Sequence, residues 1–284
     1  MAIASSPHRE PGAPAAPAPV TAPVRKPSAV VGVLREGGEL LRFSGRVLKV
    51  LPRSVGYTSE VMRQAAIIIP ATSVLLVVMQ MLIGISTVNF IYFLLKALGA
   101  TDFTGIGTAL TLRVAAVCMF GYVFVSKVCG GFVAELGAMK INQEISALES
   151  GGVDPLMYVV GTRLIASLLF IPIGTALTIV GLFAGQYLEA VIVLQGLTGA
   201  GLEQFHWGTQ TLSDSLYVLV VAATTVLFTG LASCFYGLRT SGGPAAVGEA
   251  VARSVIVNLV IVGIVDMFWV MFWYGSGNFF PIGG

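Results

Sequence analysis

Charged residues and cysteines are both scarce in this chain, and the shortage of charge limits the class of fold that the chain can adopt. Charged side chains make up 11% of the 284 residues and hydrophobic ones 56%, whereas soluble domains carry roughly 25% charged residues. Because such a composition cannot present a wettable surface, a water-soluble fold is excluded. The three cysteines, Cys118, Cys129 and Cys234, show no CxxC spacing, and we interpret them as buried thiols.

The motifs of nucleotide-dependent and metal-dependent enzymes are also missing. No GxxxxGK[ST] sequence is present to hold nucleotide phosphates, which excludes ATP binding by that route. The two histidines, His8 and His206, have no second histidine or cysteine nearby at metal-ligand spacing. No nucleophile, base and orienting acid can be assigned together. We therefore expect a chain that is not an enzyme and has no cofactor, no metal and no nucleic-acid partner.

The hydrophobic residues are concentrated in five runs, each long enough to cross a bilayer as a helix of about 20 residues. We predict an all-α integral membrane protein with an N-terminal cytoplasmic interfacial amphipathic helix and five transmembrane helices. The first run is too long for an upright helix across ~30 Å of hydrocarbon, so we expect it to tilt, to kink near Pro70 or Gly84, or to extend past the interface. The five runs are 65–95, 109–133, 159–187, 216–238 and 255–274.

Lysine and arginine are distributed unevenly between the segments that flank these runs. In short loops these residues favour the cytoplasmic side. The segments before the first run, between the second and third, and between the fourth and fifth are basic, and the other three are not. This alternation predicts a cytoplasmic N-terminus and an external C-terminus, with Gly37 and Gly243 inside and Gly201 and Gly277 outside.

The N-terminal part is predicted to have two regions. Residues 1–38 are rich in Ala and Pro and are expected to be a disordered cytoplasmic tail. Residues 39–53 form an amphipathic helix at 100° per residue, which can lie in the cytoplasmic interface with its apolar side in lipid and its cations toward anionic headgroups. Packing on another protein domain is the alternative. The cations are Arg42, Arg46, Lys49 and Arg53, and the apolar residues are Leu40, Val47, Leu48 and Leu51.

Two further features concern the external half. Residues 189–215 are apolar in part but interrupted by glycines and acids, and we expect an outer loop with short surface or re-entrant helices. Gly181 and Gly185 form a GxxxG pair, which permits close contact between membrane helices.

Three ionisable residues lie deep in the predicted runs, where a side chain that faces lipid costs several kcal/mol. These intramembrane polar candidates are Arg113, Lys127 and Asp266. Asp266 is far from either end of its run and should face protein or a water-filled cavity. Two roles are open for Asp266. It can form an interhelical ion pair or hydrogen bond that holds the bundle together, or it can contact a transported substrate.

The cytoplasmic segment between the second and third runs contains a short predicted helix. Gly151 and Gly152 end it, and the Asp154-Pro155 pair starts the next element. A short amphipathic helix on a cytoplasmic loop can dock into a groove of a separate motor protein, and an ordinary loop helix is the alternative. The predicted coupling residues are Ile141, Gln143, Glu144, Ile145, Leu148, Glu149 and Asp154.

This segment resembles the signature of the MlaE/YrbE family of lipid-transporter permeases, ELGAMK followed by (E/Q)EI.AL and G.DP. A second patch, from Tyr236 to Asp266, also resembles the family's last loop and span. Within the family the chain is more similar to the actinobacterial YrbE subunits that accompany Mce proteins, the B-type in particular, whose ending resembles YGSGNF. The matching signature residues are Glu135, Gly137, Met139, Glu144, Ile145, Ala147, Leu148, Glu149, Asp154, Pro155 and Arg163.

The resemblance covers 39–284 and implies one permease subunit of an ABC-type lipid or sterol transport complex in the plasma membrane. It implies four kinds of partner: a second YrbE-type permease, a cytoplasmic ATPase dimer that holds ATP and Mg²⁺, Mce proteins on the outer side, and the lipid itself. A membrane scaffold that anchors an envelope complex without conducting substrate is the alternative. An ion-coupled secondary transporter is disfavoured by five unpaired spans and few intramembrane charges.

Two positions depart from the family pattern. Many members have Arg-Glu-Leu-Gly-Pro in the second span, whereas Arg113 is followed here by Val114, Ala115 and Ala116. The next basic position, usually Arg, is Lys127. We therefore do not assign to this chain the lipid-contacting acid of the family pattern. Its absence fits a heterodimeric permease whose two halves are unequal.

Overall fold

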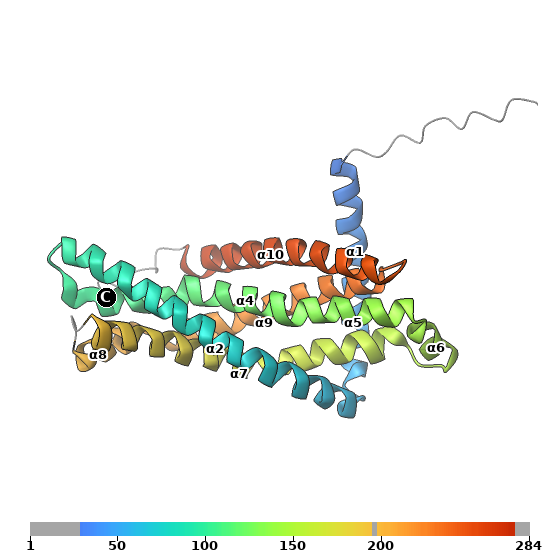
Figure 1. The fold of residues 1–284 in the computed structure, drawn as a ribbon, viewed down its shortest axis with the longest axis horizontal. Coiled ribbons are helices and arrows are strands. Elements are labelled where there is room, and N and C mark those ends of the chain that lie inside the picture. Colours follow the sequence, from blue (N-terminus) through green and yellow to red (C-terminus); the bar gives the residue numbers. More distant parts are fainter. Residues whose placement is uncertain (1–28, 195–197, 276–284) are drawn as a thin grey trace, which may run out of the picture. The chain divides into compact units, whose positions relative to one another are not determined.

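The structure is a computed structural model that describes residues 29–194 and 198–275, and all of its regular elements are helical (Figure 1). The chain divides into two units, Met1–Glu39 and Leu40–Gly284. The second unit holds five helices that are long and apolar enough to cross a membrane. The predicted all-α membrane fold with five spans is confirmed, and its orientation stays a prediction. The predictions for residues 1–28, for Gly277 and for the YGSGNF ending beyond Gly275 lie outside the described residues.

The elements follow one another with short connections. An N-terminal helix and the first span are α1 (Ala29–Ser54) and α2 (Thr58–Ala97). The second span follows the turn η1 (Thr101–Phe103) and comprises α3 (Thr104–Thr111), η2 (Leu112–Ala116), α4 (Val117–Phe124), η3 (Val125–Cys129) and α5 (Gly130–Ile141). After α6 (Glu144–Ser150), the third span comprises η4 (Leu156–Gly161), α7 (Thr162–Tyr187) and η5 (Leu188–Val193). The remaining helices are α8 (Gly199–Thr209), α9 (Leu212–Leu238) and α10 (Pro244–Tyr274).

The helices are longer than the hydrophobic runs that predicted them. α2 continues through Pro70 and extends beyond the run 65–95 at both ends, because membrane helices tolerate an internal proline. α1 begins at Ala29, well before the predicted start at Glu39. The outer loop 189–215 contains η5 and α8, as expected for a loop with short helices.

Four π turns interrupt the second and third spans: η2, η3, η4 and η5. The three other candidate spans are uninterrupted α-helices over their described lengths. A π turn bonds residue i to i+5 and disturbs the ladder of main-chain hydrogen bonds. Gln80 of α2 donates to the Ala116 carbonyl at 2.8 Å, and Gln186 of α7 donates to the Thr108 carbonyl at 3.1 Å. Both glutamines are buried, so side chains of neighbouring helices bond main-chain carbonyls of the second span at the last residue of η2 and one turn before η2.

α2 and α7 cross with their backbones in close contact. A Cβ at Gly181 would lie 3.1 Å from the Val77 carbonyl oxygen, and one at Gly185 would collide with the backbone of Met81. Gly84 of α2 has no room for a Cβ because it lies against the backbone of Leu182. The close helix contact predicted for the Gly181 and Gly185 pair is confirmed, and it holds the first and third spans together.

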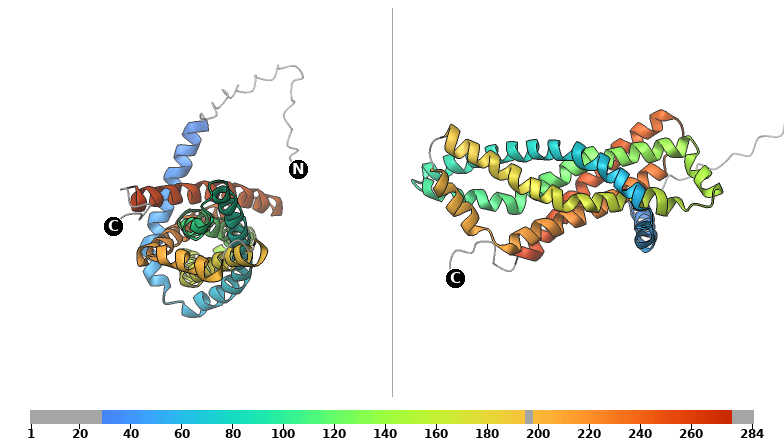
Figure 2. Two further views of the ribbon diagram at one scale, coloured as in Figure 1. Left: turned by 90° about the vertical axis from the view of Figure 1, so that its left-hand side faces the viewer. Right: turned by 90° about the horizontal axis from the view of Figure 1, so that it is seen from below.

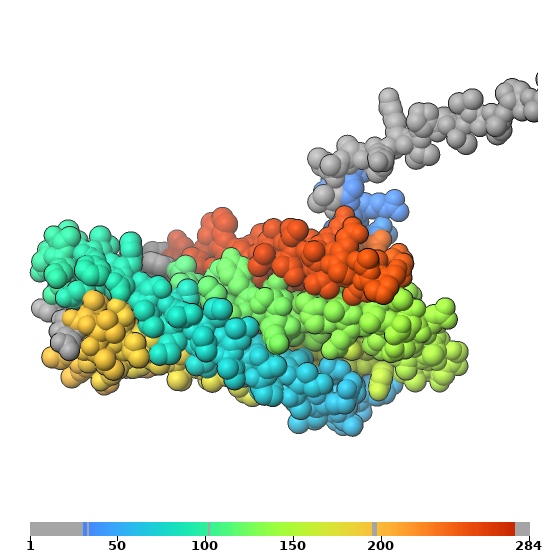
Figure 3. Space-filling model, viewed as in Figure 1, coloured from blue at the N-terminus to red at the C-terminus, as the bar shows by residue number. Residues whose placement is uncertain are grey.

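The five spans differ in how much of their surface the chain itself covers. In the most apolar window of each span, 67% of α9 residues and 61% of second-span residues are buried. The corresponding fractions are 22% for α2 and 17% for α10. α9 and the second span therefore form the centre of the bundle, and α2 and α10 present most of the surface left for lipid or a partner (Figures 2 and 3).

The two ends of the bundle are different. We call them the α6 end and the α8 end, after the short helix that lies at each. At the α6 end, the segment Leu40–Ser54 of α1 crosses the spans and packs against them (Figure 2). Phe43 and Val47 belong to the main core, and the Phe43 ring lies 5.7 Å from that of Phe235 in α9. At the α8 end, α10 stops short of the ends of α2 and α7 (Figure 1). The last turns of α2 and α7, with η5, α3 and α8, form a projecting end.

Candidate functional site

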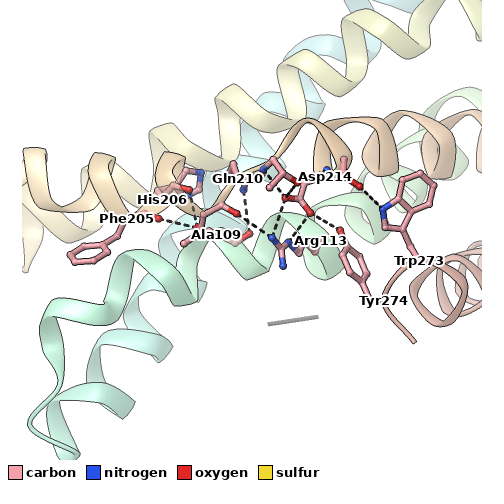
Figure 4. Close-up of polar contacts among 11 residues, drawn as sticks. Ala109, Arg113, Phe205, His206, Gln210, Asp214, Trp273 and Tyr274 are labelled. Atoms are coloured by element: carbon pink, nitrogen blue, oxygen red, sulfur yellow. Dashed lines mark hydrogen bonds and ion pairs between the residues drawn. The ribbon is translucent and has the colours of Figure 1, made fainter. Parts of the chain in front are cut away.

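Arg113, one of the predicted intramembrane cations, forms a buried ion pair with Asp214 at the start of α9 (Figure 4). Its Nε lies 3.0 Å from Oδ1, and its Nη2 donates to Oδ2 at 3.0 Å. The two side chains are 4% and 3% exposed. A guanidinium that binds both carboxylate oxygens is fixed in orientation as well as in charge, so Arg113 links the second span rigidly to α9.

Three further hydrogen bonds converge on the Asp214 carboxylate. The Tyr274 hydroxyl donates to Oδ1 at 2.9 Å, and the Thr211 main-chain N and hydroxyl each donate to Oδ2 at 2.8 Å. The Thr211 hydroxyl in turn accepts a bond from the Asp214 main-chain N, which completes a capping box at the start of α9. We call Arg113, Thr209, Thr211, Asp214 and Tyr274 the polar belt; it joins the second span, α9 and α10.

The polar belt lies where the chain is not helical between α8 and α9. Gln210 and Thr211 have extended backbone conformations, so main-chain groups at this break need partners. Arg113 Nη2 donates to the Thr209 carbonyl at 3.2 Å, and the Gln210 side chain donates to the Ala109 carbonyl at 3.4 Å. The belt therefore stabilises an interruption of the helical path at the base of the projecting end.

His206 of α8 is buried within the projecting end. Its ring lies 4.9 Å from that of Phe183 in α7, and its Nδ1 is 3.4 Å from the Thr108 hydroxyl in α3. Burial lowers the pKa of His206 to about 4, so the ring is neutral at pH 7. Among the described residues, no group of three or more His, Cys, Asp or Glu side chains could hold a metal ion.

Lys127, the second intramembrane cation, is exposed on the surface of the second span. It lies in η3, where the i to i+5 spacing of the π turn aligns it with Tyr122. Tyr122, Ser126 and Lys127 are all exposed, and we call them the second-span face. Figure 3 shows part of the second span between α10 and α2. Lys127 forms no ion pair or hydrogen bond with another described side chain.

The depth of Lys127 follows from the packing of Gly121. Gly121 lies against Val262 in the middle of α10. Six residues of helix separate Gly121 from Lys127, a rise of about 9 Å, which leaves the lysine level with the first apolar turn of α10, near Ile256. An ammonium at this level needs water, an anionic group or a carboxylate as its partner.

An apolar groove of about 390 Å³ lies farther toward the α8 end, between α2 and the second span. Val114 is one of its lining residues, at the position where the family pattern has an acid. The groove wall is therefore hydrophobic at a point where a carboxylate would have made it polar. The other lining residues are Ser86, Thr87, Phe90, Ile91, Gly107, Leu110, Thr111 and Ala115.

Asp266, the third intramembrane candidate, is half-buried on α10 beside the second span. Its Oδ1 has no hydrogen-bond partner among the described residues, and the same is true of the Tyr217 hydroxyl. Cys118, Tyr122 and Tyr217 are close enough to interact with it electrostatically. Asp266 thus adjoins the second-span face, and its packing and transport roles both stay predictions.

At the α6 end, the predicted coupling segment forms a sharp turn and a short helix. Gln143 has a left-handed backbone with φ of 60°, which separates α5 from α6. Ile145 is only 4% exposed because it packs against this chain, and Ile141 and Leu148 are partly buried. Asp154 Oδ1 accepts a bond from the Leu156 main-chain N at 2.9 Å and starts the third span. The outward face of this segment is acidic and polar: Gln143, Glu144, Glu149 and Asp154 are exposed.

A groove of about 550 Å³ lies beside α6 and reaches the start of α2. Leu148 and Tyr158 contribute apolar surface to it, and Glu60 and Arg63 form an ion pair of 2.6 Å on its wall. Arg163 also lines it and binds Glu135 at 3.0 Å. The signature residues of the second and third spans are thus joined by an ion pair next to α6.

Comparison with known proteins identifies the family to which this chain belongs. Residues 61–272 match the sequence profile of the family described as Permease MlaE. The chain belongs to the MlaE permease family. The matched part contains α6 and nearly all of the five spans of this MlaE-family chain, and it excludes α1.

Individual relatives of this MlaE-family chain are named as ABC transporter permeases. A probable ABC transporter permease protein of Synechocystis is 30% identical over 67% of this chain and 71% of its own length. A similarly named protein of Pyropia yezoensis is 26% identical over 60% and 63%. The chloroplastic protein TRIGALACTOSYLDIACYLGLYCEROL 1 of Arabidopsis thaliana is 27% identical over 52% and 42%. The chain therefore spans less than two thirds of the last two relatives.

Sequence reasoning missed the partners of Arg113. Asp214 lies in the predicted outer loop 189–215 and Tyr274 at the end of the last hydrophobic run, and no local pattern connects either with a cation. One local signal was present, because Thr211 and Asp214 have the spacing of a capping box before an apolar run. It predicts the start of α9 but not the pairing across 101 residues.

Proposed function

We propose that this chain is one permease half of an ABC-type lipid transporter, with the second-span face turned toward the transport path and a second permease subunit. The observation that supports this most strongly is the exposed Lys127 inside the second candidate span, level with the first apolar turn of α10. The bulk lipid phase is a costly surrounding for an ammonium, whereas a hydrated cavity between two permease halves would accommodate it. The apolar groove between α2 and the second span, farther toward the α8 end, would take the hydrocarbon part of a lipid.

The orientation we propose has the α6 end in the cytoplasm and the α8 end outside. The distribution of Lys and Arg supports it. The exposed acidic face of α6, with Leu148 at its edge, would then meet a separate ATPase dimer that binds ATP and Mg²⁺. Movement of α6 would reach the second and third spans directly, because α6 connects them.

The finer assignment is a YrbE-type subunit of an Mce complex in the plasma membrane, with Mce proteins at the projecting end and a lipid or sterol as substrate. The sequence resemblance to Mce-associated YrbE subunits supports it. The absence of the family's acid at Val114 supports pairing with an unlike second permease that supplies the polar group. One relative has a name that contains that of a glycolipid, trigalactosyldiacylglycerol, which favours a lipid substrate.

The test of the transport path replaces Lys127 and measures uptake of labelled lipid together with the yield of the purified complex. We expect Lys127→Met to assemble normally and to lose most transport, while Lys127→Arg retains it. Lys140→Met is the matched control, because Lys140 is exposed at the end of α5. Normal uptake by Lys127→Met would refute the assignment of the second-span face to the transport path.

The test of coupling uses Leu148→Asp, which places a charge at the proposed ATPase contact and should cost several kcal/mol of binding free energy. Ser146→Asp is the control, because Ser146 is exposed away from the α6 groove. We expect Leu148→Asp to release the ATPase from the purified complex and Ser146→Asp to keep it. Full retention by Leu148→Asp with normal transport would exclude α6 as the docking element.

A further inference from the structure

The segment of α1 from Leu40 to Ser54 has three distinct sides. Phe43, Val47 and Ser54 are buried against the bundle. At 100° per residue, the cations lie roughly 100° to one side of this buried direction, and Leu41 and Leu48 lie roughly 130° to the other side. Leu41 is 73% exposed and Leu48 is 43% exposed. One side is thus used by the chain itself, and a cationic side and an apolar side remain exposed.

The packing of α1 fixes the directions of the two exposed sides. Phe43 contacts Phe235 in the last turns of α9. At the other end of the segment, Ser54 fills the space beside Gly161, where a Cβ would collide with its hydroxyl. The Tyr57 ring then lies edge-on to that of Tyr158 at 5.3 Å. α1 therefore cannot roll about its axis without breaking contacts with both α9 and η4.

A hollow of about 470 Å³ lies over the cationic side of α1. Its lining residues are Arg42, Gly45, Arg46 and Lys49. A Cβ at Gly45 would meet nothing within 4 Å, so the glycine leaves open space among three cations.

We propose that this hollow binds the headgroup of an anionic phospholipid from the leaflet at the α6 end. Charge complementarity selects the headgroup, since three cations surround the hollow. The exposed leucines on the other side select a membrane as the source, because they can enter the acyl region while α1 lies across the span ends. The bound lipid holds α1 and, through it, the last turns of α9 and the first turn of the third span.

The experiment uses the full chain reconstituted in nanodiscs in which phosphatidylglycerol replaces part of the phosphatidylcholine. Native mass spectrometry counts the phosphatidylglycerol molecules that remain bound after release from the disc. We expect the wild-type chain to retain phosphatidylglycerol in preference to phosphatidylcholine. The combined variant Arg42→Gln, Arg46→Gln and Lys49→Gln should lose that preference by about five-fold for each cation removed.

Two variants and one competitor keep the result unambiguous. Lys140→Gln removes a cation at the same end of the bundle but outside the hollow, and it should retain lipid like the wild type. Leu41→Ser with Leu48→Ser leaves the hollow intact and should weaken retention, since it removes the membrane-facing side. Inorganic phosphate, added as the competitor, should not displace the bound phosphatidylglycerol.

Three results would overturn the proposal. One is unchanged retention in the triple variant, and another is an equal loss in Lys140→Gln, which would indicate general charge attraction. The third is displacement by inorganic phosphate, which would identify a soluble anion as the ligand. If the triple variant aggregates, the variant Arg42→Lys with Arg46→Lys preserves charge and must still retain phosphatidylglycerol for the proposal to stand.

Discussion

Removing the carboxylate of Asp214 should destabilise the chain more than removal of any exposed acid. In Asp214→Ala, the Arg113 guanidinium is 4% exposed and loses its counter-charge, and breaking a buried pair in this way costs about 3–5 kcal/mol. The same change removes the acceptor of the Tyr274 hydroxyl and one half of the capping box on α9. We therefore expect a loss near the upper end of that range.

A double variant separates the charge from the volume of the side chain. Replacing both partners, in Arg113→Met with Asp214→Ala, removes the uncompensated charge and should recover about 2 kcal/mol relative to Asp214→Ala. It should not recover everything, because the Thr209 carbonyl loses its Arg113 donor and the Tyr274 hydroxyl loses its Asp214 acceptor. Glu203→Ala is the control for an exposed acid on α8 and should change stability by less than about 0.5 kcal/mol.

The assay is reversible unfolding of the purified chain in mixed micelles, followed by helical circular dichroism as the denaturing detergent is increased. We expect the order wild type, double variant and Asp214→Ala from most to least stable. If the double variant is less stable than Asp214→Ala by the full cost of Arg113→Met, the losses are additive and the two charges are not coupled. A cost below about 1 kcal/mol for Asp214→Ala would show that the polar belt is hydrated.

Four other predictions concern His206, the crossing of α2 and α7, Asp266 and the topology. The pKa of His206 is about 4 in the fold and about 6.5 when unfolded, so the unfolded chain binds the proton first as the pH falls. The free energy of unfolding should therefore decrease from pH 6.5 toward pH 4 by up to ~1.4 kcal/mol per pH unit. His206→Phe should flatten this pH dependence, and an unchanged slope would refute the assignment. Gly185→Ala should cost about 1–3 kcal/mol in the same unfolding assay because its Cβ meets the Met81 backbone, whereas Gly263→Ala, with nothing within 4 Å, should cost nothing. Asp266→Asn should be milder than Asp266→Leu in complex yield and lipid uptake, since Asn keeps hydrogen-bonding capacity; a Leu variant equal to wild type in both would remove any interior role. A cysteine placed at Gly243 should resist membrane-impermeant labelling in intact cells, and labelling there from outside would contradict the proposed orientation.

The sequence predicted those features that follow from composition and local pattern. The number of spans followed from hydrophobic runs, and the α2–α7 contact followed from Gly181 and Gly185, because small residues determine how closely helices can pack. The end of α6 at Gly151 and the capping role of Asp154 followed from local turn chemistry. These features depend on residues that are neighbours along the chain or on one helix.

The features that were missed depend on contacts between distant segments. Periodicity divides α1 into an apolar and a cationic side, but it does not show that Val47 packs on the bundle while Leu48 is exposed. It also does not indicate that Arg113 and Asp214 are partners, since they are far apart in the sequence. A single sequence contains the residue types of such pairs but no record of which ones meet.

The distribution of the π turns has a consequence for how this protein can move. All four of the described π turns lie in the two spans that α6 joins, and α2, α9 and α10 have none. A π turn holds one extra residue, which can shift along a helix by exchanging hydrogen-bond partners one at a time, without breaking the helix. Each such shift would rotate the part between two turns against its neighbours. If α6 is the coupling element we propose, we expect the second span to respond at η2 and η3, by a rotation of the surface that bears Lys127.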